Sequence, residues 1–398
     1  MRKGWEVKKL GEVCEYKSGT TISNKLEKVE GEILYIKVGD MNLEGNEEFI
    51  TCSSRYVNIS DINSNQIIPQ GSIIFPKRGG AIATNKKRRI VSPTIVDLNT
   101  MALIPNKIIN SNYLYYWFKQ IDLASLSNGT SIPQINNYSF DNVYINLPNS
   151  QIEQERIVAI LDEAFGAIDK AKENLERNMR NAKKLFESEL NSIFEKKGDG
   201  WVEKKLGEVC DVKDGTHDSP RYIEEGIPFV TQKNIREDGL TIENTKFITQ
   251  EDHDKFYKRS NVKFGDILIS MIGANRGMAC IVNERRIFSI KNVCLVKENK
   301  NIVQKYLLYF LKSKQAINFV KTSSKGGAQE FIGLTELRIF PIPLPSIKEQ
   351  QKIVEQLDRL SVETKKLEEG YGKKLESLEE LKKSMLERAF RGELNKGE

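Results

Sequence analysis

The sequence predicts an α+β protein in which two globular α/β domains are separated by two long antiparallel coiled-coil helices, with a pseudo-two-fold internal repeat. Three observations predict this fold. Similar phrases recur at an offset of 196 residues, each half begins with strand-rich segments, and each half ends in a long stretch of helical periodicity. The predicted segments are a first domain at 1–150, a central spacer helix at 151–198, a second domain at 199–345 and a C-terminal spacer helix at 346–398.

The repeat is clearest at the beginning and the end of each half. The matching phrases, all within one residue of the same offset, are Gly4-Trp5 with Gly200-Trp201, Lys8–Cys14 with Lys204–Cys210, Leu147-Pro148 with Leu344-Pro345, Glu153-Gln154 with Glu349-Gln350, Leu161-Asp162 with Leu357-Asp358, and Phe194 with Phe390. The interiors differ mainly in loop-like stretches, where binding residues tend to lie. We interpret the halves as two copies of one scaffold with different recognition surfaces; the alternative is an old duplication with drift.

Each domain is predicted to contain short strands and at least one helix. The segments 71–75 and 265–270 are apolar runs behind a glycine turn, which is typical of strands. Segments 112–120 and 304–320 have apolar residues at helical spacing. Each domain then ends in a proline-containing exit, because proline favours an extended backbone before it and stops a helix from extending back.

The spacer helices are predicted from apolar residues that recur every four and three positions. From Ile353 the stripe runs through Leu357, Leu360, Thr364, Leu367, Tyr371, Lys374, Leu378, Leu381 and Met385, and in the first copy through Leu161, Phe165, Ile168, Lys172, Leu175, Met179, Ala182 and Phe186. Eight of the ten positions in the stripe that begins at Ile353 are apolar or aromatic, which is typical of a coiled-coil seam. The two stripes most simply bury each other; alternatives are homodimerisation through either helix, or an amphipathic helix packed on its own domain.

Composition indicates a globular protein with an anionic partner. The chain has 398 residues, 39% hydrophobic and 29% charged, and no apolar run reaches the roughly 18 residues that a membrane span needs. No signal peptide is expected, and five cysteines without a CxxC pair favour a reducing compartment, so we expect a cytoplasmic protein. The net charge is +6, with +3 in residues 1–150 and +5 in residues 200–345, which favours nucleic acid as the partner.

No catalytic chemistry is assigned to the chain. It has no Pro-Pro, and hence no amino-methyltransferase motif of the Asn/Asp-Pro-Pro-aromatic type, and it has no P-loop. The two histidines, His217 and His253, have no counterpart in the first half and no metal-ligand spacing. We therefore expect no catalytic residue, no cofactor site and no metal site in this chain.

The order of phrases resembles the specificity subunit of type I restriction-modification systems. Each domain opens with Trp followed by Lys-Lys-Leu-Gly-Glu-Val, contains a Gly-Asp-Ile-Leu type of strand, and exits through Leu-Pro into a Glu-Gln…Ile-Val helix. The resemblance implies two target recognition domains, a split double-stranded DNA target with an unspecified gap, and spacer helices that hold two methyltransferase subunits. It also implies adenine N6 methylation by that partner, which binds S-adenosylmethionine, and restriction subunits joined through the complex. The alternatives are a coiled-coil scaffold that binds only proteins, and a self-sufficient DNA enzyme.

Candidate DNA-binding residues lie in loops of both domains. In the first domain, Lys77, Arg78, Lys86, Lys87, Arg88 and Arg89 put six cations into thirteen residues directly after the strand at 73–75, a pattern that suits phosphate or groove contacts. We take Asn275 and Arg276, with Arg285 beyond, as the counterpart in the second domain. Gln134 and Gln329 are assigned to matching places as base readers. The other candidates are Thr216, His217 and Lys325. The alternatives are a solvated basic turn for residues 77–89, and a turn cap for His217, whose Gly-Thr-His setting is common in resembling sequences.

Overall fold

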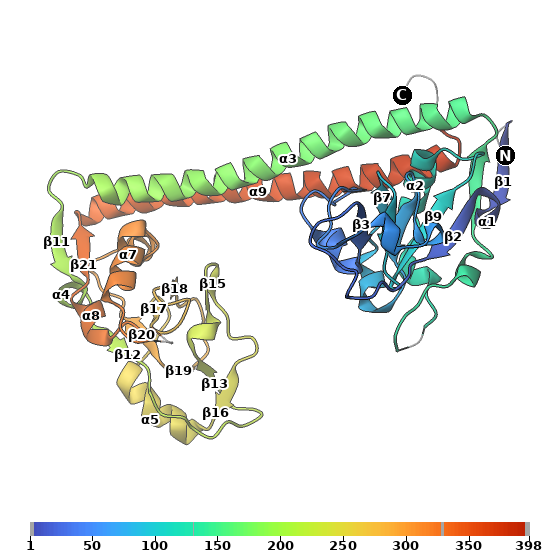
Figure 1. Ribbon diagram of the computed structural model, residues 1–398. Coiled ribbons are helices and arrows are strands. Elements are labelled where there is room, and N and C mark those ends of the chain that lie inside the picture. The colour runs from blue at the N-terminus through green and yellow to red at the C-terminus, as the bar shows by residue number, and fades with distance from the viewer. Residues whose placement is uncertain (1–3, 130, 328–329, 395–398) are drawn as a thin grey trace. The chain divides into compact units, whose positions relative to one another are not determined.

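The computed structural model describes residues 4–129, 131–327 and 330–394. The chain forms two compact units, one made of residues 1–175 with 373–398 and the other of residues 176–372 (Figure 1). Two long helices, α3 (Gln151–Lys196, 46 residues) and α9 (Ile347–Phe390, 44 residues), each contribute one segment to each unit. The predicted fold class, two α/β domains with long antiparallel helices, is confirmed.

The first unit contains a five-stranded sheet of order β2-β9-β6-β7-β4, a three-stranded sheet of order β5-β3-β8 and the pair β1-β10. Besides α3 and α9, its elements are β1 (Trp5–Lys9), α1 (Leu10–Val13), β2 (Cys14–Ser18), β3 (Ile33–Ile36), η1 (Val38–Asn42), β4 (Phe49–Ile50), β5 (Tyr56–Val57), η2 (Ile59–Asp61), η3 (Ser64–Gln66), β6 (Ile73–Pro76), η4 (Gly79–Thr84), β7 (Arg88–Ile90), β8 (Thr94–Val96), β9 (Thr100–Pro105), α2 (Ser111–Lys119), η5 (Leu123–Leu126), η6 (Asn137–Phe140) and β10 (Tyr144–Pro148).

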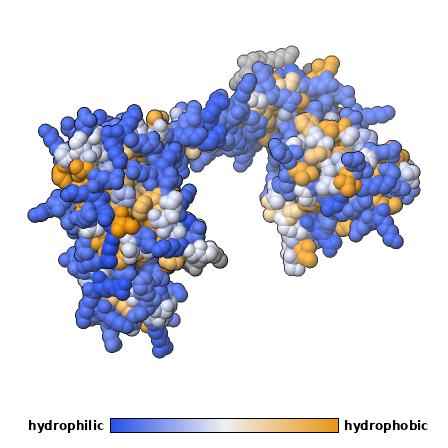
Figure 2. Space-filling view, turned by 60° about the vertical axis from the view of Figure 1, so that its left-hand side comes forward, coloured by the Kyte–Doolittle hydropathy of each residue, from blue (hydrophilic) through white to orange (hydrophobic). Residues whose placement is uncertain are grey.

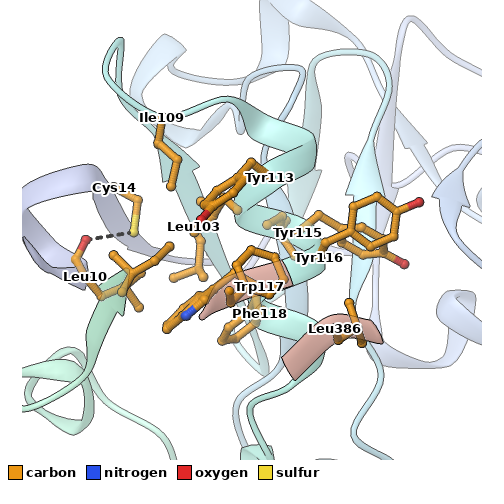
Figure 3. Close-up of a cluster of buried hydrophobic side chains, with 14 of the residues drawn as sticks. Leu10, Cys14, Leu103, Ile109, Tyr113, Tyr115, Tyr116, Trp117, Phe118 and Leu386 are labelled. Carbon is orange, nitrogen blue, oxygen red and sulfur yellow. Dashed lines mark hydrogen bonds between the residues drawn. The ribbon is translucent and has the colours of Figure 1, made fainter. Parts of the chain in front are cut away.

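Helix α2 supplies the largest side chains of the first core. Asn110 begins it as N-cap, its side chain accepting hydrogen bonds from the backbone N–H groups of Asn112 and Tyr113. Six consecutive residues, 113–118, are buried, so this helix is apolar nearly all round. Its side chains pack with Leu10, Cys14 and Leu103, and with Leu386 from α9 (Figure 3). The sequence at 112–120 predicted this helix.

The second unit repeats most of the topology of the first, except that its main sheet has four strands instead of five and a separate two-stranded pair is added. Its sheets have the orders β12-β20-β17-β18, β16-β13-β19, β14-β15 and β11-β21. Besides α3 and α9, its elements are β11 (Val202–Lys205), α4 (Leu206–Val209), β12 (Val212–Asp214), β13 (Ile227–Val230), η7 (Gln232–Asn234), β14 (Ile235–Arg236), β15 (Gly239–Leu240), β16 (Lys246–Ile248), α5 (Gln250–Ser260), β17 (Ile267–Ser270), β18 (Ala279–Ile281), β19 (Ser289–Ile290), β20 (Val293–Val296), α6 (Gln304–Leu311), α7 (Lys314–Ser323), α8 (Leu334–Arg338) and β21 (Pro341–Leu344).

The predicted helix at 304–320 is two helices rather than one. Helix α6 ends at Leu311, and α7 begins at Lys314. Ser313, fully buried between them, has an extended backbone and accepts a hydrogen bond from the N–H of Ala316 as the N-cap of α7. An N-cap residue lies outside helical geometry, so the chain bends here although the apolar spacing continues.

The repeated Glu-Gln phrase ties each domain to the start of its long helix. The side chain of Gln154, 1% exposed, accepts a hydrogen bond from the N–H of Asn110 at 2.7 Å and donates one to the carbonyl of Pro148 at 3.0 Å. Gln350 repeats both bonds, accepting from the N–H of Val303 at 2.8 Å and donating to the exit segment at 3.0 Å. These bonds satisfy backbone groups that burial would otherwise leave unpaired.

Within the first unit, the helix segments run antiparallel. Asp169 of α3 pairs with Lys382 of α9 at 2.9 Å, and Lys172 pairs with Glu379. The Lys382 ammonium also lies 4.8 Å from the centre of the Phe165 ring. Lys172, a charged position on the predicted seam, is therefore accommodated by a partner on the facing helix. Figure 2 shows the outward side of the long helices as almost entirely hydrophilic, as expected for helices that bury one stripe.

The predicted seam of α9 drifts. Ile353, Leu357 and Thr364 are buried, but Leu367 is 44% exposed and Leu381 is 47% exposed. A straight α-helix has 3.6 residues per turn, so a stripe with an average step of 3.5 rotates about 20° per heptad away from its partner. Later in the helix, Leu386 and Ala389 are buried instead, and these two positions are outside the predicted stripe.

Each core is completed by the helix end of the other repeat. Phe390, at the end of α9, lies in the core of the first unit with its ring centre 4.9 Å from that of Tyr113, and its carbonyl accepts a hydrogen bond from Asn146. Phe194, at the end of α3, lies in the core of the second unit, 5.5 Å from the ring centre of Tyr306. The matching phenylalanines of the repeat therefore have matching roles, each in the domain that its own repeat did not supply.

Candidate nucleic-acid interface

In the first domain, the loop after β6 lies beside the segment that precedes η6. The N–H of Gly79 donates to the carbonyl of Pro133 at 2.8 Å, and the N–H of Ile135 donates to the carbonyl of Lys77 at 2.8 Å. Arg78 and Gln134 are opposite each other in this antiparallel contact. We call residues 77–79 and 133–135 the first loop pair. It brings together Lys77, Arg78 and Gln134, three of the residues predicted to touch DNA.

The side chains of the first loop pair include an available cation. Arg78 is exposed and has no hydrogen bond or ion pair to any residue that the structure describes. Lys77 donates to the hydroxyl of Ser18 at 2.9 Å. Its pKa is lowered mainly by partial burial and to a smaller extent by the charge of Arg78. The amide of Gln134 donates to Asn136 at 3.0 Å. A guanidinium and an amide held side by side can hydrogen-bond base edges or phosphates.

The basic run at 86–89 divides into accessible and inaccessible cations. Lys86 is half-buried and contacts Asn42. Lys87 is only 5% exposed, and its ammonium donates to the carbonyl of Ile121 at 2.7 Å and to Asn85 at 2.8 Å. Burial lowers the pKa of Lys87 to about 8. The charge of Lys87 is thus enclosed by protein, which does not favour a phosphate contact, and its role in DNA binding stays a prediction.

Arg88 and Arg89 are also occupied within the protein. Arg88 donates to the carbonyl of Met41 at 3.2 Å, and burial lowers its pKa. The guanidinium of Arg89 lies 4.0 Å from the ring centre of Phe49 and 4.5 Å from that of Tyr115, and it also pairs with Glu48. These cation–π contacts and the ion pair hold β7 to its neighbours. The contacts of Arg88 and Arg89 in this structure are all with other residues of the protein, and their role in DNA binding stays a prediction.

The second domain has the same arrangement, with a different register from the predicted one. The N–H of Gly273 donates to the carbonyl of Glu330 and the N–H of Ile332 donates to the carbonyl of Met271, both at 2.9 Å. Residues 271–273 and 330–332 form the second loop pair, in which Ile272 and Phe331 are opposite each other. Arg78 therefore corresponds to Ile272 and not to Asn275 or Arg276.

Gln134 likewise corresponds to Phe331 and not to Gln329. Gln329 lies outside the described residues.

In the second domain, several of the residues predicted to contact DNA are bonded to other residues of the protein. Arg276 donates to the hydroxyl of Ser324 at 2.9 Å and pairs with Glu330, and Lys325 pairs with Glu336. Asn275 is exposed. Arg285 is exposed and lies over the ring of Phe264, with its guanidinium carbon 4.6 Å from the ring centre. Asn275, Arg285 and Lys325 are the more accessible of these residues, although Lys325 is paired with Glu336.

His217 belongs to a polar network around Asp214, and Thr216 precedes it in the chain. Thr216 is buried, whereas the His217 side chain is 59% exposed. The ring of His217 lies 3.0 Å from Asp214 through Nε2 and 2.7 Å from Asn292 through Nδ1. Arg259 donates two hydrogen bonds to the same carboxylate, at 2.8 and 2.7 Å. The network fixes the position of His217 at the surface and is compatible with either a base contact or a turn cap.

Sequence reasoning missed three residues at these loops: Ile272, Phe331 and Gln232. The Gln232 oxygen lies 3.5 Å from the Ser270 hydroxyl, beside the second loop pair. No local pattern marks any of them, because their proximity depends on pairing between segments about 40 to 60 residues apart. The repeat itself was the available signal, but loops of different length hide the correct alignment.

Comparisons with known proteins identify the family. Residues 2–177 and 198–377 match the Type I restriction modification DNA specificity domain. The MjaVIII specificity subunit of a type I restriction enzyme from Methanocaldococcus jannaschii is 26% identical, over 98% of this chain and 93% of that protein. The chain therefore belongs to the family of specificity subunits of type I restriction-modification systems, with two copies of the domain.

Solved structures agree on the fold. The HsdS subunit from Thermoanaerobacter tengcongensis has a TM-score of 0.61 at 20% identity, covering 99% of this chain and 98% of that chain. A chain from a study of complex assembly and conformational transition of the type I R-M system has a TM-score of 0.77 at 19% identity and covers 99% of both chains. In the described part of this chain, no helix is long and apolar enough to cross a membrane. Among the same residues, no cluster of His, Cys, Asp and Glu could hold a metal ion.

Proposed function

We propose that the chain reads a bipartite double-stranded DNA target with a fixed gap, one part through each domain. In this proposal it is not an enzyme: it recruits two adenine-N6 methyltransferase subunits, which bind S-adenosylmethionine, and restriction subunits through the complex, in the cytoplasm. The observation that carries the proposal is the duplicated loop pair, which presents polar side chains in one copy of the domain and apolar side chains at the equivalent places of the other. Duplicated readers suit duplex DNA, whose strands are related by local two-fold axes.

The direct test is to co-purify the chain with the adjacent-encoded subunits and to map methylated adenines on random DNA. We expect methylation at sites that share two short motifs with a constant gap. A complex that forms but neither binds DNA nor directs methylation would favour a protein-binding scaffold. Methylation or cleavage by the chain alone would instead establish a DNA enzyme.

Gap length is expected to follow the length of the long helices. Inserting four residues after Leu175 in α3, with four matching residues before Lys373 in α9, adds about 6 Å of helix, which corresponds to roughly two base pairs of rise. The mapped target should then keep both motifs and gain about two base pairs between them. Glu173→Ala, an exposed change in α3 that adds no length, is the control. An unchanged gap in the inserted protein would contradict a spacing role for the helices.

Two adjacent lysines allow an accessible charge to be compared with an enclosed one. Because Lys86 is half-buried and Lys87 is enclosed, we expect Lys86→Gln to reduce the slope of log affinity against log salt by about 1, the effect of one phosphate contact. Lys87→Gln should leave that slope unchanged. Both salt slopes are measured by fluorescence anisotropy of a labelled duplex at salt concentrations from about 50 to about 200 mM, the range in which such slopes are usually determined. Equal effects of the two variants would contradict the assignment.

A further inference from the structure

The two loop pairs have the same hydrogen-bond register but differ in the chemistry of their side chains. Each consists of the three residues after the central strand of its sheet and three residues near the end of the domain, joined by the same two backbone hydrogen bonds. The opposed residues are Arg78 and Gln134 in the first domain and Ile272 and Phe331 in the second. A pair of hydrogen-bonding side chains in one domain is thus replaced by a pair of apolar side chains in the other.

Phe331 is presented at the surface by a fixed backbone. Its N–H donates to the carbonyl of Lys325 and its carbonyl accepts from the N–H of Lys325, both at 2.8 Å. On its other side it is bridged to Ile272. The residue is nevertheless 43% exposed. Single exposed apolar residues are common on proteins, so exposure alone decides nothing. What distinguishes Phe331 is its position, which is equivalent to that of Gln134 in the polar pair of the first domain.

The polar neighbours of Phe331 are engaged within the protein. Arg276 is tied to Ser324 and Glu330, and the ammonium of Lys325 is paired with Glu336. These charged groups would have to give up their partners to bind a base edge, whereas Phe331 and the half-buried Ile272 lose nothing on contact with an apolar group. Apart from the Glu330 carboxylate, which is already paired with Arg276, the surface that this loop pair offers without rearrangement is apolar.

The major groove of DNA offers one apolar group, the 5-methyl of thymine. We propose, on the basis of the proposed function, that Ile272 and Phe331 form an apolar contact that recognises the methyl group of a thymine in the half-target of the second domain. The first domain uses Arg78 and Gln134 at the equivalent place, where an arginine matches the acceptors of guanine and a glutamine the donor and acceptor of adenine. The two domains thus read their halves of the target by different chemistry through one scaffold position.

The test replaces thymine by uracil, which removes only the methyl group. Each thymine of the mapped target is changed singly, and binding by the chain with its methyltransferase partner is measured. We expect one position at which uracil weakens wild-type binding about fourfold, the factor equivalent to the ~0.8 kcal/mol of one buried methyl group. In Phe331→Ala, binding to the thymine target should weaken and the thymine–uracil difference at that position should disappear. Ile317→Ala, also 43% exposed but on α7, is the control and should keep the difference.

Two outcomes would overturn the inference. The first is that uracil at every position binds the wild-type chain as well as thymine does. The second is that Phe331→Ala keeps the thymine–uracil difference at the sensitive position. If that variant also weakens both targets by the same factor, Phe331 acts as a wedge between base pairs or as support of the loop. Absence of any sequence-dependent binding by the wild-type complex would overturn the proposed function itself, so the two failures are distinguishable.

Discussion

Phe390→Ala should destabilise the first unit by about 3–5 kcal/mol, the usual cost of removing a fully packed aromatic ring, and leave the second unit unchanged. Phe390 is 4% exposed and packs edge-on against Tyr113 in the first core. Leu386, Ala389 and Leu394 lie in the same cluster, so the end of the chain closes a domain that begins at its other end. The effect should therefore appear more than 200 residues away in sequence from the substitution.

Hydrogen exchange followed by mass spectrometry measures both units in one sample, which matters because a chain with two units need not unfold in one transition. We expect faster exchange in α2 and β10 of Phe390→Ala, with protection of α6 and β21 retained. Phe194→Ala is the matched variant, since Phe194 is 1% exposed in the second core, and it should produce the reverse pattern. Equal loss of protection in both units from either variant would contradict the exchange of helix ends between repeats.

The sequence repeat, together with the strand-rich segments and the helical periodicity, was enough to predict the fold class, because similar phrases at a nearly constant offset indicate similar structures. It was not enough to predict which core each helix end completes. The Glu-Gln phrase shows the limit clearly. Gln154 and Gln350 were identified as a repeated motif, but their bonding partners, Asn110 and Val303, are 44 and 47 residues away. A motif's recurrence indicates that it matters, whereas its contacts depend on tertiary structure.

The candidate interface was predicted less completely, for a physical reason visible at two adjacent residues. Lys86 and Lys87 are indistinguishable by composition, yet Lys87 is enclosed because the carbonyl of Ile121 and the side chain of Asn85 lie beside it. Loop alignment failed similarly. The register of Phe331 with Gln134 follows from backbone hydrogen bonds, and loops of unequal length conceal it in the sequence. The placement of these residues is now a structural finding, while their contact with DNA stays a prediction.

Gly215→Ala is expected to destabilise the second unit by about 3 kcal/mol or more, because the added methyl group meets backbone rather than a movable side chain. A Cβ on Gly215 would lie 2.3 Å from the carbonyl oxygen of Ile290. The flanking bonds prevent an easy shift, since the N–H of Gly215 donates to Val293 and that of Thr216 donates to Ile290, both at 3.0 Å. The repeat contains the same constraint at Gly19, whose Cβ would lie 2.0 Å from the carbonyl oxygen of Asp97.

Urea unfolding monitored by the fluorescence of Trp201 reports on the second unit once the other two tryptophans, Trp5 and Trp117, which belong to the first unit, are replaced by phenylalanine. Gly370→Ala is the matched control in the same unit: its Cβ meets nothing within 4 Å, and replacing glycine inside α9 should stabilise by up to about 1 kcal/mol. The same chemical change should thus have opposite signs at two positions. A Gly215→Ala protein as stable as the wild type would show that β12 and β19 can separate freely, and the close approach that positions Thr216 and His217 would then not be required.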